Sequence, residues 1–153
     1  MRAVVLGAVL VLCLGASAAA QTRPKLPLLP TDVSTRHNLQ VRPFVIGYTG
    51  DGSGFLGGFD GQGVRLHFGR MRWTQWNRTQ ATGHGAVWLD DCMPDCAGGT
   101  FHPYRVTVYA TQVQANVFRR LTLRYRYQGK RVVDRRKVVH AGRDWYYGLV
   151  GVP

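Results

Sequence analysis

The chain has 153 residues with 20 Lys or Arg against eight Asp and no Glu, which gives a formal net charge of +12. Lysine and glutamate are good formers of exposed helix, and 17 of the 20 basic residues are arginine, so the composition argues against amphipathic surface helices. With no glutamate and only three serines in the chain, ordinary hydrolytic machinery has few groups to draw on.

The first 20 residues have the pattern of a secretory signal peptide. Arg2 gives a positive start, an apolar run covers residues 3–14, and small residues at 16–20 fit a cleavage rule. The alternative is a retained membrane anchor, but this run is shorter than the roughly 20 residues that span a bilayer. We therefore expect cleavage near Ala20 and a product that is secreted, extracellular or held at the cell surface, with no transmembrane anchor after cleavage.

Residues 21–42 are expected to form a linker between the signal peptide and the folded part. Pro24, Pro27 and Pro30 recur at every third position, which suits an extended polyproline conformation. The remaining residues, 43–153, are enough for one domain with its own core and too few for two.

Alternating apolar residues predict short β-strands along this domain, and no window of useful length shows a helical period. Glycine-rich segments at 49–54 and 57–63 are expected to be turns, and Gln128-Gly129 is expected to close a hairpin. The expected strands lie near residues 44–48, 64–68, 87–89, 106–110, 121–127, 131–133 and 145–150. The sequence therefore predicts an all-β single domain of about eight short strands, either an immunoglobulin-like sandwich or a small barrel.

Trp73 and Trp76 are candidates for an aromatic contact with a ligand. Their spacing of three residues places them on opposite faces of a strand. One indole would then lie in the core and the other could stack on a sugar or a base. The alternative is that both indoles are buried.

Cys92 and Cys96 are expected to form a disulfide, because Cys13 leaves with the signal peptide and two remaining cysteines outside the cell normally pair. So short a bridge fixes the shape of a turn. A catalytic dithiol is a weaker interpretation, since such pairs usually have two intervening residues and here there are three. A zinc site would need two more ligands, for which the flanking His84 and His102 are available.

The glycine-rich turn at 50–54 lacks the flanking glycines of a nucleophile elbow and the lysine of a phosphate-binding loop. Calcium would find one carboxylate there, so we expect a structural turn. The adjacent acids Asp90 and Asp91 point to opposite sides of a strand and are expected to cap turns. We expect no catalytic residue, metal ligand or cofactor. The alternative, a metal-dependent or hydrolytic extracellular enzyme, would draw on Asp51, Asp91, Asp95 and either His84 or His102.

Positive charge is concentrated in residues 119–137, which hold nine basic residues and one acid, Asp134. Such a field favours polyanions. A bias toward arginine in the composition as a whole is the alternative explanation. The candidate polyanion-binding residues are Arg119, Arg120, Arg124, Arg126, Arg131, Arg135 and Arg136.

A set of motifs between residues 43 and 127 resembles a group of small, largely uncharacterised secreted actinobacterial proteins. The motifs are TGDGSG at 49–54, Trp73-x-x-Trp76, Ala81-x-Gly83-x-Gly85, Asp91-Cys92-x-Pro94-x-Cys96-Ala97-x-Gly99 and Phe118-x-x-Leu121. The cysteine segment is the most specific of them. The resemblance implies secretion and a disulfide and brings no activity with it.

The sequence thus predicts a non-catalytic binding or envelope-associated protein whose basic face contacts an anionic cell-envelope polymer or glycan. A third hypothesis is a structural or inhibitory module that presents the Cys92–Cys96 loop to a partner protein.

Overall fold

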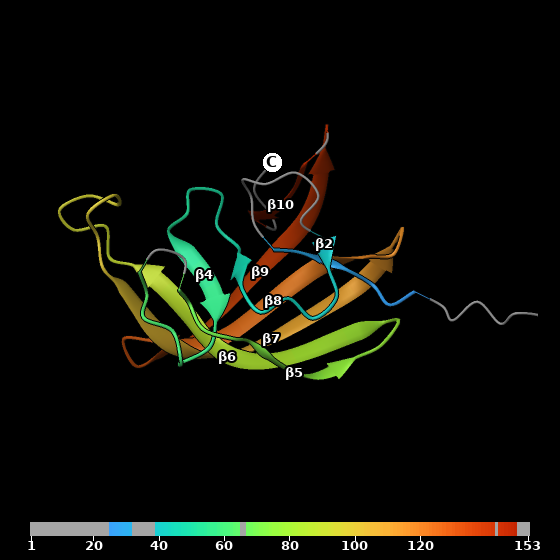
Figure 1. The fold of residues 1–153 in the computed structure, drawn as a ribbon, viewed down its shortest axis with the longest axis horizontal. Coiled ribbons are helices and arrows are strands. Elements are labelled where there is room, and N and C mark those ends of the chain that lie inside the picture. Colours follow the sequence, from blue (N-terminus) through green and yellow to red (C-terminus); the bar gives the residue numbers. More distant parts are fainter. Residues whose placement is uncertain (1–24, 32–38, 65–66, 143, 150–153) are drawn as a thin grey trace, which may run out of the picture.

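The computed structural model describes residues 25–31, 39–64, 67–142 and 144–149, and these residues form ten β-strands and no helix (Figure 1). The prediction of an all-β fold is confirmed. The expected signal peptide lies outside the described residues. The strands are β1 (Leu29–Pro30), β2 (Leu39–Gln40), β3 (Ile46–Gly47), β4 (Gly54–Gly57), β5 (Arg72–Trp76), β6 (Gln80–Asp90), β7 (Phe101–Gln114), β8 (Val117–Tyr127), β9 (Lys130–Ala141) and β10 (Asp144–Leu149).

Eight of the described strands form one antiparallel sheet with the order β10-β9-β8-β7-β6-β4-β3, in which β5 also pairs with β6. The sheet curls into a half-barrel, and its long strands β6 to β9 form the wall (Figure 1). The short strands β1 and β2 pair with each other. Of the two expected architectures, the curled sheet is nearer to the small barrel, although its central strands of 11 to 14 residues are longer than expected.

The edge of β6 is shared by two shorter strands. Its first half pairs with β5 and its second half pairs with β4. Gly85 lies between the two paired stretches, and a Cβ atom there would clash with the carbonyl oxygen of Gly57. The chain therefore needs glycine where β4 and β5 meet.

The core lies on the inner, concave face of the sheet. Alternate residues of β7 and β8, such as Val106, Val108 and Leu123, are at most 1% exposed. Residues from the N-terminal part of the chain pack over them, among them Leu29 and Ile46, which have no exposed surface. The half-barrel is thus filled by segments that precede its wall in the sequence.

The described part of the expected linker belongs to this core. Leu29 is fully buried, the Trp76 indole donates a hydrogen bond to the Pro27 carbonyl at 3.0 Å, and the Tyr147 hydroxyl donates to the Pro30 carbonyl at 2.8 Å. The prolines suit this role because their carbonyl groups still accept hydrogen bonds. The expectation of a spacer over this segment is corrected accordingly.

The strand expected near 64–68 is absent from the described residues of that segment. Gly63 and Gly69 have φ angles of 67° and 68°, which interrupt an extended backbone. The chain instead turns there, leaving Val64 54% exposed and burying Phe68 to 2%. The expected first strand is also shorter than predicted, because only Ile46–Gly47 pairs.

The two tryptophans of β5 lie on the same face, contrary to the expectation from their spacing. A β-bulge between Trp73 and Gln75 adds one residue to β5. The extra residue turns the side chain of Trp76 to the same face of the strand as that of Trp73. The rings meet edge to face at 4.7 Å, and Trp76 is 6% exposed. Trp73 donates its own indole hydrogen bond to the Pro43 carbonyl at 2.8 Å. Both indoles therefore help to hold the core together.

The first prediction concerns the N-terminal segment. Leu29→Ala should lower the free energy of unfolding by about 2–5 kcal/mol, because it opens a cavity in a fully buried site. Leu26→Ala is the matched control, since Leu26 is 37% exposed and should cost about 0.5 kcal/mol or less. Urea denaturation measures both, and equal effects would show that the segment is not part of the domain.

Candidate functional site

Basic side chains gather on the outer face of the curled sheet. Arg72 of β5 is paired with His84 of β6, which is paired with Thr107 of β7, which in turn is paired with Arg124 of β8. Side chains that are paired across strands lie on the same face. We call this surface the outer basic face, and its basic residues are Arg72, Arg105, Arg120, Arg124, Arg126, Arg131, Arg135 and Lys137.

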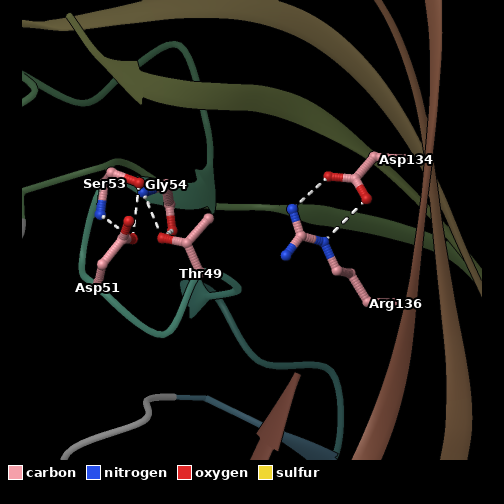
Figure 2. Close-up of polar contacts among 6 residues, drawn as sticks. All are labelled: Thr49, Asp51, Ser53, Gly54, Asp134 and Arg136. Atoms are coloured by element: carbon pink, nitrogen blue, oxygen red, sulfur yellow. Dashed lines mark hydrogen bonds and ion pairs between the residues drawn. The ribbon is translucent and has the colours of Figure 1, made fainter. Parts of the chain in front are cut away.

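Five of the seven arginines predicted from the sequence lie on this face. The other two turn to the inner side. Arg136 donates two hydrogen bonds of 2.8 Å to the carboxylate of Asp134 (Figure 2), and the guanidinium of Arg119 lies 4.6 Å from the centre of the Trp145 ring. Both have partners inside the half-barrel and are therefore left out of the outer basic face.

Arg72 and Arg105 were not among the predicted residues. They lie outside the arginine-rich segment, and cross-strand pairing brings them beside it. Arg105 does alternate with apolar neighbours in the expected strand at 106–110, which is a weak sign that it points outward. Nothing in the linear sequence places Arg72 on the same face of the sheet as the arginines of β7 and β8.

No carboxylate of the described residues forms an ion pair with a basic side chain of the outer basic face. Among the described residues the ion pairs are His102 with Asp91 and Arg136 with Asp134. Asp60 lies in the loop after β4, and its Oδ1 accepts a hydrogen bond of 3.0 Å from the Arg70 amide. This bond, together with the positive charges of Arg72 and Arg70, lowers the pKa of Asp60. The arginines therefore keep their charge available to an anion.

Two adjoining hollows lie in this face. The first, of about 440 Å³, is bounded by β5, β6, β7 and the loop after β4, and the second, of about 600 Å³, by β7 and β8. They share Phe59 and Arg105, whose guanidinium lies 5.4 Å from the centre of the Phe59 ring. Arg124 likewise lies 5.1 Å from the ring centre of Tyr109. Such aromatic contacts hold a guanidinium in place without neutralising it.

A second, smaller apolar cluster anchors the loop that walls the first hollow. The indole of Trp88 is 5% exposed and donates to the carbonyl oxygens of Gly58 and Phe68, at 3.2 Å and 3.1 Å. Phe68 stacks on Phe55 with ring centres 4.1 Å apart. This cluster fixes the chain on either side of Phe59, and so it sets the position of the wall.

The Cys92–Cys96 disulfide is present and closes a loop that projects from the end of β6, seen in yellow in Figure 1. Aspartates bind the backbone of this loop, as expected from the sequence. Asp91 Oδ1 accepts from the amides of Met93 and Thr100 at 3.1 Å and 2.9 Å. Asp95 Oδ1 accepts from two further amides. Met93 is 72% exposed at its tip.

The groups that an enzyme would have drawn on do not gather at one metal site. Asp51 accepts hydrogen bonds from the amide and hydroxyl of Ser53 within its own turn (Figure 2). Asp91 and His102 lie 3.0 Å apart. No group of three or more His, Cys or Asp side chains in the described part of the chain is arranged to hold a metal ion.

Comparison of the chain with protein-family models, with curated proteins and with solved structures finds no match. In the residues that the structure describes there is no helix with the length and apolar character needed to cross a bilayer. The functional interpretation therefore depends on the geometry of this chain alone.

The second prediction concerns the anchor of the loop. Trp88→Phe removes the donor to the Gly58 carbonyl and should lower the free energy of unfolding by about 1–3 kcal/mol. Hydrogen exchange at the Gly58 amide, which donates to Phe68, should become faster. Trp145→Phe is the matched control, since no indole hydrogen bond of Trp145 occurs among the described residues. Equal losses in the two variants would contradict the anchoring role.

The third prediction is a pH dependence of the stapled loop. The pKa of Asp91 is lowered to about 2 by three contacts. The largest effect comes from the hydrogen bond of the Thr100 amide, followed by the hydrogen bond with His102 and that of the Met93 amide. The carboxylate therefore stabilises the loop fully above its unfolded pKa of about 3.9, and this is lost as the pH falls through 2. The amide chemical shifts of Met93 and Thr100 should titrate with a midpoint near 2 and should not titrate in Asp91→Asn. A midpoint near 4 would contradict the assigned hydrogen bonds.

Proposed function

We propose that the outer basic face binds an anionic polymer and that the protein is a non-catalytic binding or envelope-associated module. The observation that carries this proposal is the arrangement of arginines on adjacent strands without carboxylate partners in the described structure. Neighbouring strands lie about 4.8 Å apart, and outward residues on one strand about 6.7 Å apart. A repeating anion can meet several such charges at once.

The chemistry of the side chains favours holding an anion over transforming it. A guanidinium stays protonated at any physiological pH and offers only donors. Paired N–H donors match the oxygens of phosphate, sulfate and carboxylate groups. The aromatic rings beside Arg105 and Arg124 add apolar surface for the uncharged part of a polymer.

We propose that the protein works outside the cell, on an anionic cell-envelope polymer or glycan. The apolar start of the chain has the pattern of a signal peptide. The Cys92–Cys96 disulfide is compatible with an oxidising compartment. Nucleic acid has the same charge, and the experiment below includes it as a competing outcome.

The stapled loop supports a second candidate function, the presentation of a fixed shape to a partner protein. Its tip at Met93 is 72% exposed, and three aspartates bind the backbone amides around it. A loop that is ordered before binding loses less conformational freedom when a partner docks. This candidate uses a different surface, so variants separate it from polymer binding.

The fourth prediction is that binding depends on salt and on the outer arginines. Affinity for teichoic acid, a sulfated glycan and duplex DNA should be measured by fluorescence anisotropy at several salt concentrations. The test variant carries three substitutions together, Arg124→Ala, Arg131→Ala and Arg135→Ala. For DNA, this variant should reduce the steepness of log affinity against log salt by about one unit for each arginine that contacts a phosphate. At low salt, the affinity of this variant for the preferred polymer should be at least about tenfold lower than that of the unchanged protein.

Arg42→Ala/Arg78→Ala serves as the control, since both side chains are exposed and outside the outer basic face. It should bind nearly as well as the unchanged protein. Preference for DNA over both envelope-type polymers would reassign the partner. Absence of binding to all three probes at low salt would contradict the proposal. Met93→Ser should leave the affinity for the polymer unchanged. A loss of affinity in this variant would show that the stapled loop binds the polymer instead.

A further inference from the structure

The first hollow differs from the rest of the outer basic face because several donors converge on it. It has a volume of about 440 Å³ and lies between β5, β6, β7 and the loop after β4. Arg72 comes from β5, His84 from β6, and Arg105 and Thr107 from β7. The lining of the second hollow comes mainly from β7 and β8, whereas the first receives side chains from three strands and from the loop after β4.

The fold places these donors side by side, and contacts hold the side chains of Arg105, His84 and Thr107. Arg72 is paired with His84 in the register of β5 and β6, and Arg105 stacks against Phe59. His84 Nδ1 lies 3.4 Å from the Thr107 hydroxyl oxygen, across the β6–β7 pair. Neither arginine takes part in the ion pairs of the described residues. The side chains of Arg105, His84 and Thr107 are therefore positioned before any ligand arrives.

The charge of the lining favours an anion. Arg70, Arg72 and Arg105 face a single carboxylate, that of Asp60, so two positive charges remain in excess with His84 neutral. The Arg70 amide already occupies Oδ1 of Asp60. The guanidinium of Arg70 lies 4.4 Å from the centre of the Phe44 ring, so it adds positive field at the rim.

The number of donors favours a tetrahedral anion over a planar one. A carboxylate has two oxygens, and one guanidinium fork satisfies both. Two guanidinium groups, a hydroxyl and an imidazole offer more donors than a carboxylate accepts. Phosphate and sulfate groups carry three or more oxygens that point in different directions, and these match donors arriving from three strands.

We propose that this hollow binds one tetrahedral oxyanion, a phosphate or sulfate group of the polymer, and thereby fixes where the polymer lies on the outer basic face. The inference rests on the proposed function, because the hollow is one end of the same surface. The second hollow shares Phe59 and Arg105 with it and continues toward Arg124 and Arg126. The next unit of the polymer would lie there, beside Arg124.

The test is a titration of the ¹⁵N-labelled protein with sodium phosphate, sodium sulfate and sodium acetate at constant ionic strength, followed by NMR. Phosphate or sulfate should give saturable shifts at the amides of Arg72, His84, Arg105 and Thr107, and acetate should not. A preference between the two tetrahedral anions identifies which ester the polymer carries.

Variants assign the effect to the hollow. Arg72→Ala and Arg105→Ala should each weaken the preferred anion at least about tenfold, as expected for loss of a charge-assisted bidentate contact. The affinity of Arg72→Lys should lie between that of these variants and that of the unchanged protein, because lysine keeps the positive charge and loses the paired N–H donors of the guanidinium. Arg78→Ala is the matched control, because Arg78 is exposed and lies outside the outer basic face, and it should change the affinity less than about twofold. Circular dichroism verifies that each variant is folded.

The outcomes distinguish this inference from the proposed function. If all three anions give equal, unsaturable shifts over the whole face while a polymer still binds, the inference is overturned and the proposed function stands. If phosphate saturates at the hollow and no polymer binds, the proposed function fails and the oxyanion site stands. Equal losses of affinity in Arg78→Ala and Arg72→Ala would show that the anion responds only to the overall charge, which also overturns the inference.

Discussion

Filling of the inner face of the half-barrel is the interaction on which the rest of the structure depends. A curled sheet with one apolar face must cover that face, and here the covering residues, such as Leu29 and Ile46, come from segments that precede the wall. Once the inner face is taken by apolar packing, the two-residue period of β8 and β9 sends the intervening arginines outward. The outer basic face is therefore a consequence of how the core is filled.

Arg119 and Arg136 of the same segment point inward instead, and Arg136 shows what such a position requires. Arg136 has the inward period, and a charge there is tolerated because Asp134, two residues earlier on the same strand, accepts both of its hydrogen bonds (Figure 2). The side chains of the pair are 15% and 14% exposed. The guanidinium of Arg136 lies 5.2 Å from the ring centre of Tyr48, and burial is the main cause that raises the pKa of this tyrosine. The arginine-rich segment thus serves both faces of the sheet.

The sequence predicted local features well and non-local ones poorly. Gln128 and Gly129 have the positive φ angles of the expected hairpin turn, 48° and 76°, and the disulfide joins the expected cysteines. The bulge in β5 and the packing of Leu29 could not be predicted, because both are decided by contacts with distant strands. For the same reason the density of arginine indicated five residues of the outer basic face, whereas Arg72 and Arg105 needed the register.

The charge of the outer basic face depends as much on the acids as on the arginines. All of the aspartates that the structure describes, except Asp144 at the start of β10, accept hydrogen bonds from nearby groups. The acceptors are Asp51, Asp60, Asp90, Asp91, Asp95 and Asp134. Backbone amides are the main donors, and they bind the aspartates to turns and to the stapled loop. Asp134 pairs with the inward-pointing Arg136 of β9, and none of the other carboxylates forms an ion pair with an arginine of β7, β8 or β9 among the described residues. The chain has few acids, and most of those described accept hydrogen bonds from nearby backbone amides. Together these two properties leave a surface suited to binding anions.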